Sequence, residues 1–183
     1  MVTYLNLSEE DYAATFRELL GKGRISAPGH IGTHLDCYTA IPDRESYTRL
    51  EAVVLDCLKG MPGAAAFNAL PSLKGRVLIL HAGNEEENRY GSEAYFKRET
   101  FLSEEALEAL LAKSPLFIIV DSHGLNQSGV LHKALDVKCK RHGCHVIENA
   151  SLKALTGKST VVVSINVDFH NTSTGKPCTI ELH

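Results

Sequence analysis

The stretch His30-Ile-Gly-Thr-His34-Leu-Asp36 places two imidazoles and a carboxylate close together in the chain. Neutral imidazole nitrogens and carboxylate oxygens are ligands that bind Zn²⁺ or Mn²⁺ at neutral pH. The dipeptide Pro28-Gly29 before it is a turn signal, so we expect the stretch to begin on a loop and to enter an extended segment. Along an extended segment His34 and Asp36 point to the same face. The spacing leaves two interpretations open: a metal site, or three solvated polar residues in a surface loop.

Length and composition indicate one globular domain over residues 1–183. The chain is 44% hydrophobic and 22% charged, as expected of a soluble protein with a sizeable core. The formal net charge of -3 gives no sign of a nucleic-acid partner, and the longest basic run is the short segment 138–141. The N-terminus lacks the basic start and apolar run of a signal peptide, and no apolar stretch is long enough to span a bilayer.

The cysteines favour a reduced, cytoplasmic protein. Their number is odd and no two form a CxxC pair, which argues against a disulfide framework. Cys37 directly follows Asp36, and a thiolate there would be a strong metal ligand; the alternative is a small half-buried side chain that points away from Asp36. The five positions are Cys37, Cys57, Cys139, Cys144 and Cys178.

Apolar runs and helical spacing predict a mixed α/β domain. Strands are expected over residues 51–57, 76–81, 116–121, 144–148, 160–166 and 176–181. Helices are expected over residues 8–21, 62–69, 92–98, 103–113, 128–141 and 151–155. Polar segments predict loops over residues 40–47, 84–91 and 172–175. Strands alternate with helices in the middle of the chain, and a strand pair closes it.

Polar residues recur where the predicted strands end, which is where α/β proteins commonly build sites. These residues are His81, Asp121, His123 and Glu148. The helix over 128–141 adds His132 and Asp136, which are one turn apart and share a face. That pair is compatible with a metal ligand set, and the alternative is the polar stripe of an amphipathic helix.

The opening stretch resembles the first part of the H-x-G-T-H-x-D-x-P-x-H signature of the cyclase family, which includes bacterial kynurenine formamidase and isatin hydrolase. Other segments resemble the family in the same order: residues 75–83 its "G-D-x-L-L-x-R-T-G" strand, residues 142–149 its "H-G-x-x-I-L-E-N" segment, and residues 161–179 its closing hairpin. The resemblance implies a swivelling β/β/α domain, with a mixed sheet and flanking helices, assembled as a homodimer or homotetramer.

The resemblance also implies an activity. Family members hydrolyse small amides or lactams with a divalent metal, Zn²⁺ or Mn²⁺, so a small-molecule substrate is expected. By resemblance His30, His34 and Asp36 are metal ligands, and Glu148 is a ligand from a later strand. A metal held by imidazoles and carboxylates lowers the pKa of its water and polarises a carbonyl, which is consistent with this role.

The sequence departs from the family pattern at three positions. The proline of the signature is Tyr38, and its terminal histidine, a catalytic acid/base in the family, is Ala40. The family's later metal-binding histidine falls on Asp136, and His132 is a candidate to take over that role.

Three residues are candidates to move protons in place of the missing acid/base: Asp136, His123 and His81. Two hypotheses follow: a metal-dependent hydrolase, or a family member that has lost catalysis and keeps a metal site for structure or small-molecule binding. The sequence leaves open whether one or two ions bind, and the change to Asp136 argues mildly for one.

Overall fold

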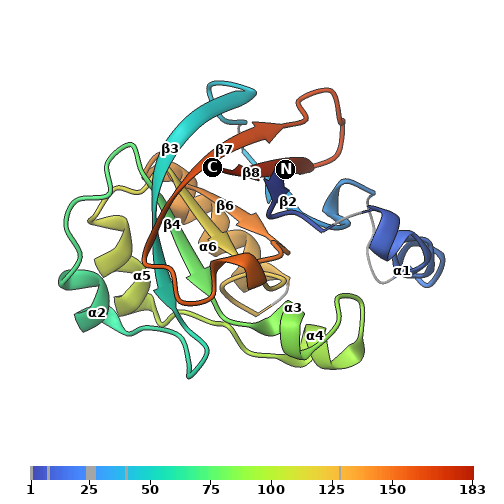
Figure 1. Cartoon of the computed structure of the whole chain (residues 1–183), viewed down its shortest axis with the longest axis horizontal. Helices are drawn as coiled ribbons and strands as arrows, with labels where there is room; N and C mark the ends of the chain where they lie inside the picture. Colours follow the sequence, from blue (N-terminus) through green and yellow to red (C-terminus); the bar gives the residue numbers. More distant parts are fainter. Residues whose placement is uncertain (1, 8, 24–27, 40, 128) are drawn as a thin grey trace.

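The computed structural model describes residues 2–7, 9–23, 28–39, 41–127 and 129–183, and the expected features at residues 8, 40 and 128 lie outside these ranges. Within them the strands form one sheet in the order β1-β8-β2-β6-β5-β4-β3-β7, and an additional β7–β8 pairing closes it (Figure 1). The strands are β1 (Thr3–Tyr4), β2 (His34–Asp36), β3 (Ser46–Asp56), β4 (Val77–His81), β5 (Phe117–Val120), β6 (His145–Glu148), β7 (Thr160–Val167) and β8 (Gly175–Leu182).

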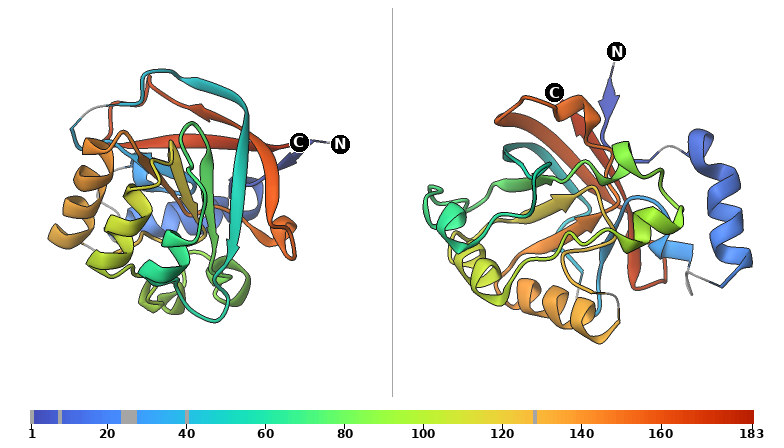
Figure 2. Two further views of the ribbon diagram at one scale, coloured as in Figure 1. Left: turned by 90° about the vertical axis from the view of Figure 1, so that its left-hand side faces the viewer. Right: turned by 90° about the horizontal axis from the view of Figure 1, so that it is seen from below.

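The sheet is mixed. Strands β3, β4, β5 and β6 pair in parallel, whereas β2, β7, β8 and β1 pair antiparallel to their neighbours. Helices α2 (Ala64–Asn68), α5 (Glu104–Leu111) and α6 (Val130–Arg141) lie together on one side of the parallel strands, while α1 (Glu9–Gly21) lies apart from them (Figures 1 and 2). The predicted mixed α/β sheet with flanking helices is confirmed.

Two apolar layers hold the sheet in place. Along β4, Ile79 belongs to the cluster inside the closed sheet, whereas Leu78 and Leu80 pack in the cluster beneath the helices. Successive side chains of a strand point to opposite faces, so an unbroken apolar run suits a strand that is covered on both sides. This two-sided burial fixes the parallel strands, and their carboxyl ends can therefore hold polar side chains in defined positions.

Most predicted elements are confirmed, with small shifts at their ends. Helix α4 (Glu93–Lys97) and helix α5 begin after the caps Ser92 and Ser103, whose hydroxyls accept hydrogen bonds from backbone N–H groups. Over 151–155 only the short 3₁₀ turn Lys153–Leu155 forms.

Two loop predictions were wrong in part. Strand β3 begins at Ser46, inside the expected loop 40–47, because its antiparallel pairing with β7 continues to that residue across an irregularity. The expected loop 84–91 begins with helix α3 (Asn84–Glu87). Three glutamates in its first turn interact favourably with the positive end of the helix dipole. A short helix therefore forms here, although the polar composition of the segment predicted a loop.

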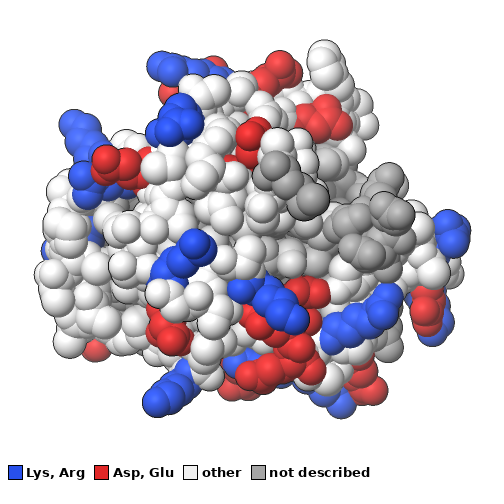
Figure 3. Space-filling view, in the orientation of Figure 1, with Lys and Arg blue, Asp and Glu red and all other residues white. Residues whose placement is uncertain are grey.

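The surface is mixed in charge. On the face drawn in Figure 3, Lys and Arg side chains are interspersed with Asp and Glu side chains. Among the described residues, no helix is both long enough and apolar enough to cross a membrane.

Candidate metal centre

The opening stretch folds as the sequence predicts. The 3₁₀ turn η1 (Pro28–His30) is followed by strand β2, in which His34 and Asp36 lie on one face. His30 Nδ1 lies 2.9 Å and His34 Nε2 3.2 Å from Asp36 Oδ1. Strand β2 pairs with β6 so that His34 is opposite Glu148, and His34 Nε2 lies 3.9 Å from Glu148 Oε2. The structure therefore brings together the four residues expected to hold a metal.

Helix α6 adds two more side chains to this group. His132 Nε2 lies 2.9 Å from Asp36 Oδ2, 3.2 Å from Asp136 Oδ2 and 3.4 Å from Glu148 Oε1. The face that carries His132 and Asp136 is thus turned toward the carboxylates of β2 and β6. We call His30, His34, Asp36, His132, Asp136 and Glu148 the ligand cluster.

The ligand cluster contains two sets of atoms that share Asp36. One set is His30, His34 and Asp36; the other is Asp36, His132, Asp136 and Glu148. Within each set all candidate ligand atoms lie within 4.8 Å of one another. Asp36 presents Oδ1 to the first set and Oδ2 to the second. Each set has the mixture of nitrogen and oxygen donors that suits an ion such as Zn²⁺ or Mn²⁺.

Several carboxylate oxygens of the ligand cluster are buried without a hydrogen-bond partner among the described residues. They are Asp36 Oδ1, both oxygens of Asp136, and Glu148 Oε1. A buried carboxylate oxygen without a hydrogen bond is costly, and a bound cation offsets that cost. The donor set and its unsatisfied oxygens therefore fit a divalent metal ion.

The pKa values of Asp36, Asp136 and Glu148 reflect how close together these buried carboxyl groups lie. Burial and then the charge of Glu148 raise the pKa of Asp136 to about 9. Burial and the charge of Asp36 raise the pKa of Glu148 well above its usual value. Burial also acts to raise the pKa of Asp36, but the neighbouring imidazoles of His132, His30 and His34 outweigh it and hold that pKa far below the usual value. Asp36 is thus the fixed negative charge between the two sets.

Hydrogen bonds outside the ligand cluster orient its imidazoles. His34 Nδ1–H donates to the carbonyl of Gly32 at 2.9 Å, which leaves Nε2 facing the carboxylates. His30 Nε2 lies 2.8 Å from Thr174 Oγ1, which leaves Nδ1 facing Asp36. Partners of this kind fix the tautomer and the ring orientation of metal-binding histidines.

The proton-transfer candidates at the strand ends occupy two different environments. His81 Nε2 lies 2.6 Å from Glu86 Oε1, so the structure places His81 outside the ligand cluster. His123 has a buried Nδ1 with no partner among the described residues, and its ring contacts Phe96 at 5.7 Å between centroids. Burial and then the positive charge of His132 lower the pKa of His123, which favours its neutral imidazole.

Cys37 packs inside the closed sheet and belongs to neither set of candidate ligands. Burial raises the pKa of its thiol to about 11. The structure therefore favours the interpretation of Cys37 as a small side chain that is not a metal ligand, and it shows this side chain buried where a half-buried one was expected.

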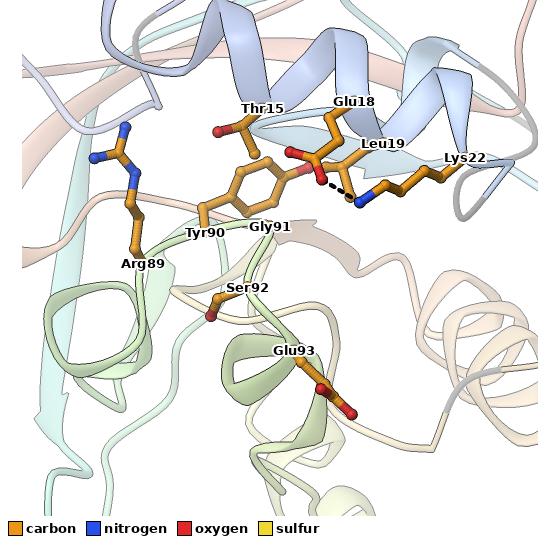
Figure 4. A pocket seen from close by; sticks show the side chains of 9 residues that line it. All are labelled: Thr15, Glu18, Leu19, Lys22, Arg89, Tyr90, Gly91, Ser92 and Glu93. Atoms are coloured by element: carbon orange, nitrogen blue, oxygen red, sulfur yellow. Dashed lines mark hydrogen bonds and ion pairs between the residues drawn. The ribbon is translucent and has the colours of Figure 1, made fainter.

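Sequence reasoning missed two tyrosines that contact the opening stretch. Tyr38 O–H donates to Asp36 Oδ2 at 2.6 Å. Tyr90 O accepts the backbone N–H of Gly32 at 2.9 Å, and its ring lines a pocket of about 380 Å³ between α1 and residues 89–93 (Figure 4). The position of Tyr38 next to the stretch was a signal for the first, whereas no local pattern links Tyr90 to Gly32.

Fold and ligand cluster together define a mixed α/β protein with a candidate metal-ion site. Residues 3–127, more than half of the chain, match the family model described as "Putative cyclase". The chain therefore belongs to the cyclase family, and the family and fold expected from the sequence are confirmed. No curated protein sequence matches the chain significantly.

Solved structures share the fold at low sequence identity. A potential metal-dependent hydrolase with cyclase activity is 16% identical with a TM-score of 0.64, covering 84% of this chain and 78% of its own. An isatin hydrolase bound to the product analogue thioisatinate is 18% identical with a TM-score of 0.62, covering 85% and 72%. Isatin hydrolase A from Labrenzia aggregata is 14% identical with a TM-score of 0.60, covering 84% and 73%. At these identities the likeness is one of fold.

Proposed function

We propose that this protein is a metal-dependent hydrolase of a small amide, lactam or related C–N bond, with a kynurenine formamidase-like (arylformamidase) specificity. The observation that carries the proposal is a set of buried oxygens of Asp36, Asp136 and Glu148 that have no hydrogen-bond partner among the described residues, three of which lie 2.9 to 3.4 Å from imidazole nitrogens. The family's name and the hydrolases among the similar structures support it.

The ligand cluster would hold Zn²⁺ or Mn²⁺. His30, His34 and Asp36 form one ligand set, and His132, Asp136 and Glu148 complete a second around the same Asp36. The sharing of Asp36 favours two ions, which the sequence had left open. When bound, such ions supply Lewis acidity, which activates water and polarises an amide carbonyl.

Of the three proton-transfer candidates, His123 has the best position. Its Nδ1 is buried without a hydrogen-bond partner among the described residues, and its lowered pKa favours the neutral imidazole, so in this proposal Nδ1 would accept a proton and return it to the leaving nitrogen. His81 is engaged by Glu86, and Asp136 is assigned as a ligand rather than as an acid/base.

The alternative is a family member that keeps the metal site and has lost catalysis. Ala40 favours this alternative, because an alanine stands where the family signature has its acid/base histidine. An alanine side chain carries no ionisable proton.

Metal analysis followed by turnover assays separates the two functions. We expect the purified protein to bind a divalent ion and to hydrolyse isatin or N-formylkynurenine faster with added Mn²⁺ or Zn²⁺ than with a chelator. Bound metal without turnover of any amide, lactam or lactone tested would support the alternative. Failure to bind Mn²⁺ or Zn²⁺ would contradict both.

Restoring the missing histidine is a second test. Under the alternative, Ala40→His gives a large gain in rate, whereas Ala40→Gln, which adds a polar side chain without a group that titrates near neutral pH, gives none. Under the main proposal the wild-type protein already turns over, and neither change raises the rate more than a few-fold.

We also propose that the protein assembles as a homodimer or homotetramer, as the family resemblance implies. Light scattering of the purified protein measures the mass of the particle, and a monomer at micromolar concentration would contradict this.

A further inference from the structure

Tyr38 stands where the family signature has a proline, and it reaches the centre of the ligand cluster. Its O–H donates to Asp36 Oδ2 at 2.6 Å. The same oxygen lies 2.9 Å from His132 Nε2. A proline has no side-chain donor. This chain therefore has a hydrogen-bond donor on the shared carboxylate at a position where the family pattern provides none.

Two further contacts hold the ring of Tyr38. The ring lies nearly parallel to the imidazole of His30, with centroids 6.4 Å apart and an interplanar angle of 26°. Lys133 Nζ, from helix α6, lies 5.3 Å from the centroid of the Tyr38 ring. A cation over an aromatic face is attracted by the ring quadrupole. The tyrosine thus connects the β2 side of the ligand cluster to the helix on its other side.

The hydroxyl of Tyr38 helps to fix the orientation of the Asp36 carboxylate. Asp36 Oδ1 faces His30 and His34, while Oδ2 faces His132. Rotation about the last bond of an aspartate side chain is soft, so this division of the two oxygens needs external partners. A phenol is protonated at neutral pH, so the Tyr38 O–H that lies 2.6 Å from Asp36 Oδ2 is a donor to that oxygen.

The second ligand set has the greater need for such a donor. It contains three carboxylates and one imidazole, and neither oxygen of Asp136 has a hydrogen-bond partner among the described residues. Where the family pattern has a neutral histidine, Asp136 adds a further carboxylate, so correct placement of Asp36 matters more on this side.

We propose that Tyr38 is a positioning residue that holds Asp36 Oδ2 toward helix α6 and so completes the ion site of His132, Asp136 and Glu148. This inference rests on the proposed function, because it assigns Tyr38 to the second of the two ion sites. Groups that orient metal ligands in this way are typically worth ten- to hundred-fold in metal affinity.

Calorimetric titration of chelator-treated protein with Mn²⁺ tests the inference. Tyr38→Phe keeps the ring and removes only the hydroxyl. We expect the wild type to bind two ions, and Tyr38→Phe to bind one of them about tenfold or more weakly. Tyr47→Phe is the matched control, because Tyr47 packs edge-on against Phe117 and does not contact the ligand cluster; it should bind as the wild type does.

Combining Tyr38→Phe with a second substitution in either ligand set identifies which of the two ion sites is weakened. In a His132→Ala background, which impairs the second set, Tyr38→Phe should change the remaining Mn²⁺ affinity by less than about threefold. In a His30→Ala background, which impairs the first set, the same change should weaken Mn²⁺ binding about tenfold. The melting temperature of Tyr38→Phe in chelator should fall, because a hydrogen bond to a buried carboxylate is lost, so the difference in Mn²⁺ affinity between the two backgrounds, and not stability, separates positioning from a general structural role.

The outcomes distinguish the inference from the proposed function. Tyr38→Phe with wild-type binding at both sites would overturn the inference alone, as would equal weakening in the two backgrounds. A wild type that binds a single ion would also overturn the inference and leave a one-ion hydrolase standing. A wild type that binds no divalent ion would overturn the proposed function and this inference together.

Discussion

Two clusters of histidine and carboxylate lie at strand ends in this molecule, and they differ in hydrogen bonding. In the β4–β5 cluster (His81, Glu86 and Asp121), the imidazole pairs with Glu86, and the two oxygens of Asp121 accept the backbone N–H groups of Ala82 and Gly83 at 2.9 and 2.7 Å. In the ligand cluster, four carboxylate oxygens are buried without a hydrogen-bond partner among the described residues, and three of them lie 2.9 to 3.4 Å from imidazole nitrogens. The same residue types thus serve structure in one place and leave ligand positions open in the other.

The carboxyl pKa values show the same difference. Burial raises the pKa of Asp121, but the N–H groups of Ala82 and Gly83 and the charge of His81 act against the increase. For Asp136, burial and the neighbouring carboxylate Glu148 act together, and the pKa rises to about 9. A buried acid with donors is a structural element, whereas a buried acid pressed against another acid is a candidate for binding a cation.

The largest expected effect comes from the residue that both ligand sets share. Asp36→Asn should weaken Mn²⁺ or Zn²⁺ binding at least about 100-fold and abolish turnover, because it removes the charge common to both sets. His81→Gln in the β4–β5 cluster should change the affinity less than about threefold. Calorimetric titration of both variants measures this, and similar losses in the two would remove the distinction between the clusters.

The sequence predicted one side of the ligand cluster and not the other. The alternation of a strand places His34 and Asp36 on one face, and the apolar runs locate the strands. The pairing of His34 with Glu148 is a sheet register between segments far apart in the chain, which periodicity does not give; the family resemblance implied only that Glu148 is a metal ligand. Helical spacing puts His132 and Asp136 on one face, but only the packing of α6 shows that this face meets Asp36.

The sequence did not separate His81 from His123, since both follow apolar strands. Their difference depends on Glu86, which lies in helix α3, where the sequence predicted a loop. Without that helix, nothing local shows that His81 has a partner and that His123 Nδ1 has none among the described residues.

A histidine outside both clusters tests whether a buried imidazole makes the stability of the protein depend on pH. Burial and then the positive charge of Lys140 lower the pKa of His145 to about 4, with Asp43 acting in the opposite direction, and the ring lies beside Phe117. As the pH falls, the unfolded chain takes up a proton on this imidazole before the folded protein does. The contribution of neutral His145 to the free energy of unfolding is therefore complete above pH 6.5 and is lost as the pH drops toward 4.

We expect His145 to account for a loss of about 2 kcal/mol over that pH range, a value reduced for its partial exposure. The free energy of unfolding of the wild type and of His145→Gln, both in chelator, measures it from urea titrations at each pH. The difference between the two proteins should shrink or reverse toward pH 4. A difference that stays constant with pH would contradict the assignment.

Asp121→Asn tests the structural role of the β4–β5 cluster. An amide offers one acceptor oxygen, and its NH₂ group would face a backbone N–H of Ala82 or Gly83. We expect a loss of about 1.5 kcal/mol in the free energy of unfolding, with Mn²⁺ affinity within about threefold of wild type. A large loss of metal affinity would mean that the two clusters are coupled.

Asp136→Asn should give the smallest change in stability, and with the opposite sign. In the metal-free protein the Asp136 carboxyl has no hydrogen-bond partner among the described residues and is crowded by Glu148, so a neutral amide relieves an unfavourable arrangement. We expect a gain of about 1 kcal/mol in chelator, or a rise of about 2–4 °C in melting temperature. Mn²⁺ affinity should fall at least about tenfold in the same variant.

Glu104→Gln, which changes an exposed acid on α5, is the matched control and should change neither quantity. If Asp136→Asn instead destabilised the metal-free protein as Asp121→Asn is expected to do, the Asp136 carboxyl would stabilise the fold. The proposed difference between the two clusters would then be wrong for Asp136.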